Sequence, residues 1–178
     1  MSDLNGAHGP DASVTAEAFC RAIRAELVGA MTLFCGDRGV AEELAQEALT
    51  RAFERWATLD SPRAWTFATA FNLARSRFRR TRAERRAQAR IADLSASPVD
   101  PDTSTAIAVR AAVSELPDRQ RQVILCRFYG GLSVRETARA MRCAEGTVKS
   151  TTSHAIASLR RAGLHIDDTA DEEAPTHA

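Results

Sequence analysis

Apolar residues recur every three or four positions along most of this chain, which is the spacing of helices that bury one face. In the first half, the pattern predicts helices over about residues 15–35 and 40–56 and a third that begins at Pro62. Asp37 can cap the second helix, and Ser61 can cap the third. The predicted inward positions are Phe19, Ile23, Leu27, Ala30, Phe34, Val40, Leu44, Ala48, Ala52, Trp56, Ala64, Phe67 or Ala68, Phe71, Ala74 and Phe78.

The second half of the chain predicts four further helices, of which the first two cover about 105–116 and 117–129. The last two, within 131–161, have the pattern of a helix-turn-helix. Ser133 can cap the first of them, and Glu136 three residues later completes a capping box. The turn falls at 142–144, and the predicted inward residues of the pair are Val134, Thr137, Ala138, Met141, Val148, Thr152, Ala155 and Leu159.

The side of the last helix opposite its apolar stripe is small, polar or basic near its start. Such a surface permits close approach to DNA, contacts to phosphates and hydrogen bonds to base edges. An ordinary helical hairpin with a solvated face is the alternative interpretation of the same pattern. The residues concerned are Gly146, Thr147, Lys149, Ser150, Ser153 and His154.

Changes in composition along the chain predict its division into domains. Residues 1–12 are polar and are expected to be disordered, and 92–104 combine prolines, small residues and aspartates, as a linker does. No convincing strand alternation is found. We therefore expect an all-α protein with two small helical domains, over 13–91 and 105–163, joined by a flexible linker and followed by an acidic, disordered tail over 164–178.

Charge is unevenly distributed, although the net charge of the 178-residue chain is only +1. Eight arginines and one acid fall between Arg75 and Arg90, whereas five acids and no base fall between Asp167 and Glu173. The asymmetry suggests contact with a polyanion. The four cysteines lack metal-ligand spacing, and no cofactor or metal is expected. No membrane span or signal peptide is evident, so a cytoplasmic protein is expected.

Three segments resemble conserved regions of bacterial sigma factors of the extracytoplasmic-function class. They are AEELAQEALTRAFERW (Ala41 to Trp56), SPRAWTFATAFNLARSRFRR (Ser61 to Arg80) and ELPDRQRQVILCRFYGGLSVRETARAMRCAEGTVKS (Glu115 to Ser150). The order and spacing of the three segments are together more specific to this family than any single segment. The form of the last segment is similar to a subgroup common in actinobacteria.

The resemblance implies a promoter-specificity subunit with no catalysis of its own. Its partners would be core RNA polymerase, through the clamp helices of the largest subunit and the flap, promoter DNA, and an anti-sigma factor. The polymerase contacts would be Glu43, Gln46, Glu47 and Thr50, although such a face alone is typical of a solvated helix. The minus-ten contacts would be Arg63, Asn72, Arg75, Arg79 and Arg80. The minus-thirty-five contacts would be Arg135, Glu145, Gly146, Thr147, Lys149, Ser150, Ser153 and His154.

The chain departs from the family pattern at several of these positions. Thr151 and His154 stand where the family commonly has arginine, which weakens two expected DNA contacts. Ala144 replaces the usual capping serine before the recognition helix, and Phe71 stands where arginine is common in the minus-ten segment. Trp65 and Phe71 are expected to be core residues rather than base-stacking ones.

Two other functions compete with this hypothesis. An ordinary helix-turn-helix regulator would bind duplex DNA unaided, usually as a dimer on paired half-sites, but would leave residues 41–80 without a role. An enzyme is disfavoured because the sequence shows no cluster of catalytic groups and no phosphate-binding loop. The expected activity is promoter-directed transcription initiation of a stress or specialised regulon.

Overall fold

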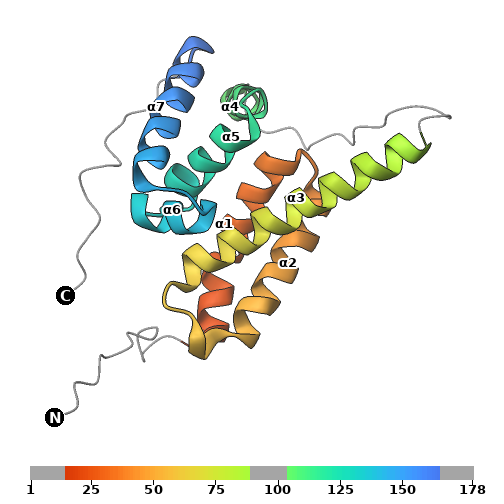
Figure 1. Ribbon diagram of the computed structural model, residues 1–178, viewed down its shortest axis with the longest axis vertical. Helices are drawn as coiled ribbons and strands as arrows, with labels where there is room; N and C mark the ends of the chain where they lie inside the picture. The colour runs from red at the N-terminus through yellow and green to blue at the C-terminus, as the bar shows by residue number, and fades with distance from the viewer. Residues whose placement is uncertain (1–14, 89–103, 165–178) are drawn as a thin grey trace.

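The computed structural model describes residues 15–88 and 104–164, which form helices and connecting turns without a strand. This all-α architecture confirms the predicted fold class (Figure 1). The helices are α1 (Ala16–Cys35), α2 (Arg38–Glu54), the 3-10 turn η1 (Trp56–Thr58), α3 (Pro62–Gln88), α4 (Ser104–Ser114), α5 (Asp118–Ile124), the π-helical turn η2 (Leu125–Tyr129), α6 (Val134–Met141) and α7 (Glu145–Arg161). The predicted disordered end, linker and acidic tail lie almost entirely outside the described residues.

Local side-chain hydrogen bonds determine where several helices begin. The Thr15 hydroxyl accepts a hydrogen bond from the Ala18 N–H at 3.2 Å, and the Asp37 carboxylate accepts one from the Val40 N–H at 2.8 Å. Each bond satisfies an N–H group that has no partner inside its helix. Between the two helices, Gly36 closes α1 with a φ of 75°, a conformation that glycine adopts without steric cost. The predicted cap at Asp37 is thereby confirmed.

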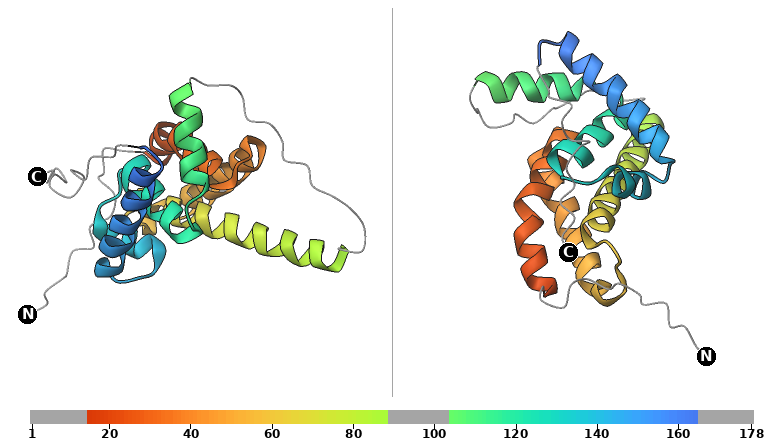
Figure 2. Two further views of the ribbon diagram at one scale, coloured as in Figure 1. Left: turned by 90° about the horizontal axis from the view of Figure 1, so that it is seen from above. Right: turned by 90° about the vertical axis from the view of Figure 1, so that its left-hand side faces the viewer.

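The helices form two groups that pack directly on each other. Helices α1, α2 and α3 pack together as the N-terminal group, and α5, η2, α6 and α7 pack together as the C-terminal group. Helix α4, which precedes α5 in the chain, is counted with the C-terminal group. Helix α3 packs on α6, while α1 contacts α4, α5 and η2. The end of α3 extends beyond the rest of the helical body (Figure 2).

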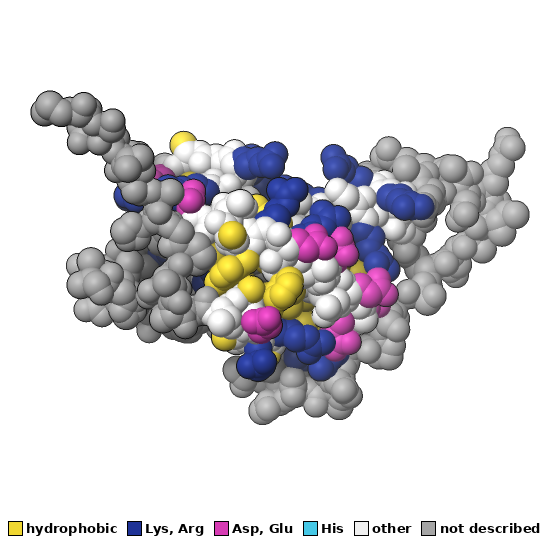
Figure 3. Space-filling model, turned by 90° about the horizontal axis from the view of Figure 1, so that it is seen from below, with side chains coloured by type: hydrophobic (Ala, Val, Ile, Leu, Met, Phe, Trp, Pro, Cys, Tyr) yellow, Lys and Arg dark blue, Asp and Glu magenta, His cyan; other side chains and the backbone are white. Residues whose placement is uncertain are grey.

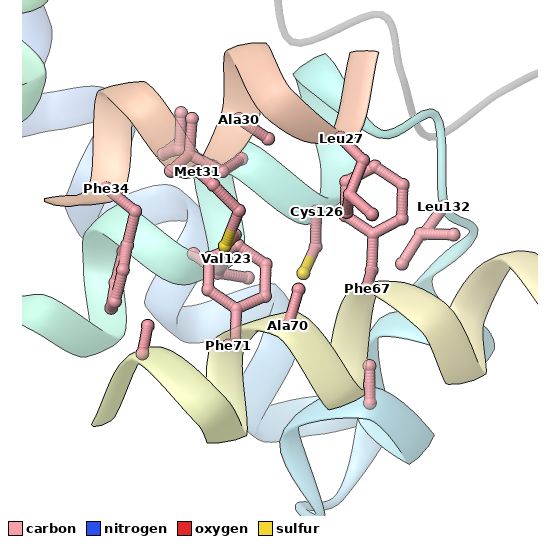
Figure 4. Packing of buried hydrophobic residues seen from close by; sticks show 14 of the residues in the cluster. Leu27, Ala30, Met31, Phe34, Phe67, Ala70, Phe71, Val123, Cys126 and Leu132 are labelled. Carbon is pink, nitrogen blue, oxygen red and sulfur yellow. The ribbon is translucent and has the colours of Figure 1, made fainter. Parts of the chain in front are cut away.

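One continuous apolar core joins the two groups (Figure 4). Phe67, Ala70 and Phe71 of α3 point toward Val123 and Cys126 of the C-terminal group, and all five are fully buried (Figure 4). Leu27, Ala30, Met31 and Phe34 of α1 cover the same layer from the other side. The removal of this apolar area from water is the main favourable contribution to holding the groups together.

Two glycines permit the close approach of the groups. A Cβ atom on Gly130 would lie 2.8 Å from Cε1 of Phe67, and one on Gly29 would lie 2.0 Å from the hydroxyl oxygen of Tyr129. Both distances are shorter than a van der Waals contact, so neither position accommodates a larger residue without movement. The absence of a side chain at 29 and 130 is therefore part of the interface.

Arg121 links the ends of two helices that belong to different groups. Its guanidinium donates hydrogen bonds to the carbonyls of Val113 at 3.1 Å and Leu116 at 3.0 Å, near the end of α4. It also donates to the carbonyl of Phe34 at 3.0 Å, at the end of α1, and lies 5.8 Å from the centre of the Phe34 ring. A cation in this place donates to carbonyls at the ends of both helices and interacts favourably with both helix dipoles.

The predicted inward faces are mostly correct, with one error at Phe78. Its side chain is 40% exposed, because α3 has passed beyond the helices that cover its earlier turns. It keeps only a tilted ring contact with Phe34, at 6.2 Å between centroids. Four further predicted positions are half-buried, namely Phe19, Val40, Trp56 and Val134.

The start of α7 lacks a capping side chain, as predicted from Ala144. This residue has the extended conformation of a cap, with φ −71° and ψ 151°, but no side-chain acceptor.

We expect Ala144→Ser to raise the free energy of unfolding by about 1 kcal/mol. The melting temperature should rise by about 2–4 °C in a calorimetric scan. The control is Ala157→Ser on the exposed middle of α7, which should be neutral or slightly destabilising, and equal gains at both positions would contradict the capping explanation.

Candidate nucleic-acid and polymerase interfaces

The helix-turn-helix is built by a capping box and a tight turn. The Ser133 hydroxyl accepts from the Glu136 N–H at 3.2 Å, and the Glu136 carboxylate accepts from the Ser133 N–H at 2.9 Å. The turn that follows α6 places Arg142 in the left-handed region at φ 51°. The capping box fixes the start of α6, and the left-handed Arg142 turns the chain toward α7. The predicted capping box is confirmed.

Helix α7 has a buried face and an exposed face, as a DNA-reading helix needs. The stripe of Val148, Thr152, Ala155 and Leu159 is buried as predicted. A Cβ atom on Gly146 would meet nothing within 4 Å, so its backbone is open to a close partner. All the predicted minus-thirty-five contacts are exposed, namely Arg135, Glu145, Gly146, Thr147, Lys149, Ser150, Ser153 and His154.

The five predicted minus-ten contacts on α3 do not have equivalent surroundings. Asn72, Arg79 and Arg80 are exposed. Arg63 and Arg75 are partly buried, and both contact the C-terminal group. The Arg63 Nε donates to the carbonyl of Gly130 at 2.7 Å, and the guanidinium also forms an ion pair with Glu26. Arg75 donates to the side-chain oxygen of Gln122.

A cavity of about 570 Å³ lies beside Asn72, between the two groups. Trp65 and Arg55 line it from the N-terminal group, with the Arg55 guanidinium 6.0 Å from the Trp65 ring centre. Arg139 and Arg142 line it from α6 and the turn. The sequence prediction did not include these last two arginines. Arg139 follows Arg135 by four positions and Arg142 follows Arg139 by three, a spacing that could have indicated a shared basic face.

The acidic face predicted on α2 is exposed and ordered by ion pairs. Glu43, Gln46, Glu47 and Thr50 all lie on the surface. Glu47 pairs with Arg51 of the same helix at 2.7 Å, and Glu43 pairs with Arg77 of α3. One face of the molecule has acidic side chains gathered beside an apolar patch, with basic side chains around them (Figure 3).

Phe53 extends the α2 surface and was absent from the predicted contacts. Its side chain is 48% exposed, which is unusual for a large apolar residue. It follows Gln46 by seven positions, so it lies on nearly the same side of the helix. An aromatic residue among polar ones is a common feature of protein interfaces.

Glu136 connects the helix-turn-helix to the predicted minus-ten surface. Its carboxylate accepts a hydrogen bond from the Ser61 hydroxyl at 3.0 Å, across the two groups. Partial burial acts to raise the pKa of Glu136. Hydrogen bonds from Ser133 and Ser61 and the charge of Arg63 outweigh that effect and leave the pKa below its ordinary value.

The cysteines show no arrangement for metal or disulfide chemistry in the part of the chain that the structure describes. Burial raises the pKa of the Cys126 thiol to about 12 and that of Cys35 to about 11, so neither forms a thiolate readily. Within 15–88 and 104–164, no group of three His, Cys, Asp or Glu side chains could hold a metal ion. None of the helices described has the length and apolarity that crossing a membrane requires.

Comparison with protein families identifies both groups of helices. Residues 19–84 match the family described as Sigma-70 region 2, and residues 106–159 match Sigma-70, region 4. Taken together, the two matches include all the predicted DNA and polymerase contacts.

Individual relatives show the same likeness over most of their length. The chain is 33% identical over 124 residues to the RNA polymerase sigma-E factor of Streptomyces coelicolor, covering 67% of this chain and 70% of that protein. It is 30% identical over 163 residues to the ECF RNA polymerase sigma factor SigK of Mycobacterium bovis, covering 85% and 87%. The fold is similar to the sigma factor RpoE of Bartonella quintana, solved in complex with the anti-sigma factor NepR. The TM-score is 0.70 at 21% identity, covering 82% of this chain and 94% of that one.

The lowered pKa of Glu136 makes a pH-dependent contribution to stability. A carboxyl whose folded pKa is lowered stabilises the fold above its unfolded pKa, near 4.5, and loses that contribution as the pH falls through the folded value. We therefore expect Glu136→Gln to destabilise the protein most at neutral pH and less in acid. Denaturant unfolding across this pH range measures the difference from wild type. The exposed Glu115, changed to Gln, is the matched control, and a difference that grew toward acid pH would contradict the assignment.

Proposed function

The chain belongs to the extracytoplasmic-function sigma factors of bacterial RNA polymerase, and on that premise we propose which surface carries each step of its work. It directs the polymerase to specific promoters and takes part in transcription initiation. The observation that supports this assignment is the presence of three chemically different surfaces in one chain. They are an acidic face on α2, an arginine-rich α3 and a small, polar and basic face on α7.

Helix α2 is proposed to bind the clamp helices of the largest polymerase subunit. The exposed Glu43, Gln46, Glu47 and Thr50 offer acceptors and negative charge to an arginine-rich partner. Phe53, on the same side, would add apolar contact at the edge of this surface. The C-terminal group would then bind the flap of the polymerase.

Helix α3 and the loop before it are proposed to hold the melted non-template strand of the minus-ten element. The cavity beside Asn72 is lined by Trp65 and by arginines, and a base outside the stack needs such a mixture of apolar walls and polar groups. Arg63 and Arg75 would contact the strand once their present partners release them. Arg79 and Arg80 would add phosphate contacts that do not depend on sequence and weaken as salt rises.

Helix α7 is proposed to recognise the minus-thirty-five element as duplex DNA. Gly146 allows close approach, and Lys149 supplies a positive charge beside the Ser150 and Ser153 hydroxyls. Thr151 and His154 replace the arginines common in the family, so the contact should be weaker than usual and depend on the polymerase for support. The family matches favour domains over 13–91 and 105–163, with 92–104 as the linker.

The regulation of the protein, its target genes and its location in the cell are inferred from the family. We propose that an anti-sigma factor binds this protein, as NepR binds its structural neighbour, and that the target genes form a stress or specialised regulon. Nucleotide addition would be performed by the polymerase, and this chain would contribute binding alone. The protein would act on chromosomal DNA in the cytoplasm.

Run-off transcription with purified core polymerase and genomic promoter fragments tests the function. We expect specific transcripts only when the polymerase and this protein are both present.

The double substitution Gln46→Ala and Glu47→Ala should weaken co-elution with the core enzyme at least about tenfold, which corresponds to about 1.4 kcal/mol. Glu17→Ala is the control, because Glu17 is also an exposed acidic residue but lies on α1 and not on this face. Equal losses for both variants would contradict the proposed polymerase surface.

The recognition surface of α7 is tested by Lys149→Ala and Ser153→Ala. Both residues are exposed, so the fold should be unchanged. We expect each to lower transcription from promoters with an intact minus-thirty-five element several-fold, with co-elution with the core enzyme unchanged. Ser158→Ala, farther along the same helix, should have little effect. Loss of core binding in the Lys149 variant would show that the surfaces are wrongly assigned.

A further inference from the structure

We propose that a groove between α1, α2 and α4 binds the acidic C-terminal segment of this same chain, residues 165–178. The groove has a volume of about 780 Å³, and its walls come from both groups of helices. The inference uses none of the predicted DNA or polymerase contacts. It rests on the apolar lining of the groove, on its charge and on the sequence of the segment that follows α7.

One side of the groove is an apolar strip along about two turns of α1. The α1 residues that line this strip are Ala25, Val28, Gly29, Thr32 and Leu33. Tyr129 and Val109 line the groove from the C-terminal group and are 42% and 37% exposed. Among the described residues only four large apolar side chains are so exposed, and two of the four line this groove. Exposed apolar side chains gathered in one hollow indicate a surface that another segment covers.

The charged residues that line the groove are mostly basic. They are Arg24 of α1, Arg38 and Glu42 of α2, and Arg110 of α4. Arg38 and Glu42 form an exposed ion pair at 3.1 Å, whereas Arg24 has no ion-pair partner among the described residues. Three arginines and one carboxylate leave the groove positively charged. A segment that fits it is therefore both apolar and acidic.

The segment that follows α7 combines acidic and apolar residues in this way. Its sequence, HIDDTADEEAPTHA, has five acids within 167–173 and neither lysine nor arginine. Ile166 directly precedes the acids, and Leu164, the last described residue, packs against the apolar core. The Ile166 side chain would bury apolar area on the α1 strip, while the carboxylates that follow it would pair with the arginines.

The acidic run can reach the groove from the end of α7. Asp167 lies three residues beyond Leu164 and Glu173 lies nine, which allows about 10 to 30 Å of extended chain. Helix α7 itself is about 25 Å long, and its last turns lie at the same end of the molecule as α4 (Figures 1 and 2). The reach of the acids is thus comparable to the length of a whole helix, which is enough to bring them to the α4 side of the groove.

The other two segments outside the described residues fit the groove less well. Residues 1–14 contain two acids, and residues 89–103 contain three acids together with Arg90. Residues 89–103 also have to connect α4 to the end of α3, which extends beyond the helical body. Charge and reach therefore favour 165–178. A partner protein that used the groove would have to displace this segment, so its apparent affinity would fall by the fraction of molecules whose groove is open.

A zero-length crosslink on the full-length protein tests the contact. Lys149 is the only lysine of the chain, so Arg24→Lys adds one reactive amine to the groove and keeps its positive charge. A carbodiimide activates carboxyl groups and joins one to a lysine amine as an amide, and the reagent takes up the water as a urea. Arg119→Lys is the matched control, because Arg119 is exposed on α5 and does not line the groove. Arg38→Lys repeats the test from the α2 side.

Mass spectrometry of the digested protein gives the yield of links to the acids of 167–173. We expect a yield at least about fivefold higher in Arg24→Lys and Arg38→Lys than in Arg119→Lys, because docking raises the local concentration of these carboxylates. The excess should be lost at about 1 M salt, where the screening length is about 3 Å. A mixture of unlabelled and isotope-labelled protein should show that the links form within one chain.

Several outcomes would overturn the proposal. They are equal yields in the groove and control variants, links that join two copies of the chain, and groove links that go instead to the acids of 1–14 or 89–103. A parallel sample with added glycinamide verifies that the carboxyl groups were activated, so the absence of links to 167–173 also counts against it. None of these outcomes bears on promoter-specific transcription with the core enzyme, so a failure here is distinguishable from a failure of the proposed function.

Discussion

The shared apolar layer between α1, α3 and the C-terminal group is the interaction on which the rest of the structure depends. Phe67 and Phe71 fill it from α3, and Val123 and Cys126 fill it from the opposite side. Because non-directional burial alone would allow the helices to slide, polar contacts at the edges of the layer fix their positions. Arg121 is the most connected of these, since it ties the ends of α1 and α4 to α5.

Much of the fold could be predicted because it is encoded locally. The caps at Asp37 and Ser133 and the buried stripe of α7 depend on residues three or four apart, which periodicity and capping rules detect directly. Phe78 was misplaced because periodicity marks a side of a helix but not the point where the covering helices end. The π-helical turn at Leu125–Tyr129 gives no periodic signal of its own.

The contact between the groups could not be predicted, for a different physical reason. It depends on the absence of side chains at Gly29 and Gly130 and on long-range bonds such as that from Arg63 to the Gly130 carbonyl. Nothing in the sequence pairs residues so far apart. The candidate contacts themselves came from family resemblance. Such a resemblance indicates which residues face DNA in the complex with polymerase. It does not indicate which residues they contact in the free protein. The arginines at 139 and 142 were missed for another reason, since their helical spacing from Arg135 was visible in the sequence.

The close fit of Gly130 against Phe67 has a consequence for how such proteins can be recombined. Here a chimera that joined this N-terminal half to the C-terminal half of a relative would carry whatever residue the relative has opposite Phe67. Any side chain larger than hydrogen would require the Phe67 ring or the backbone near it to shift, so the packing of donor halves depends on this position whatever promoter they recognise.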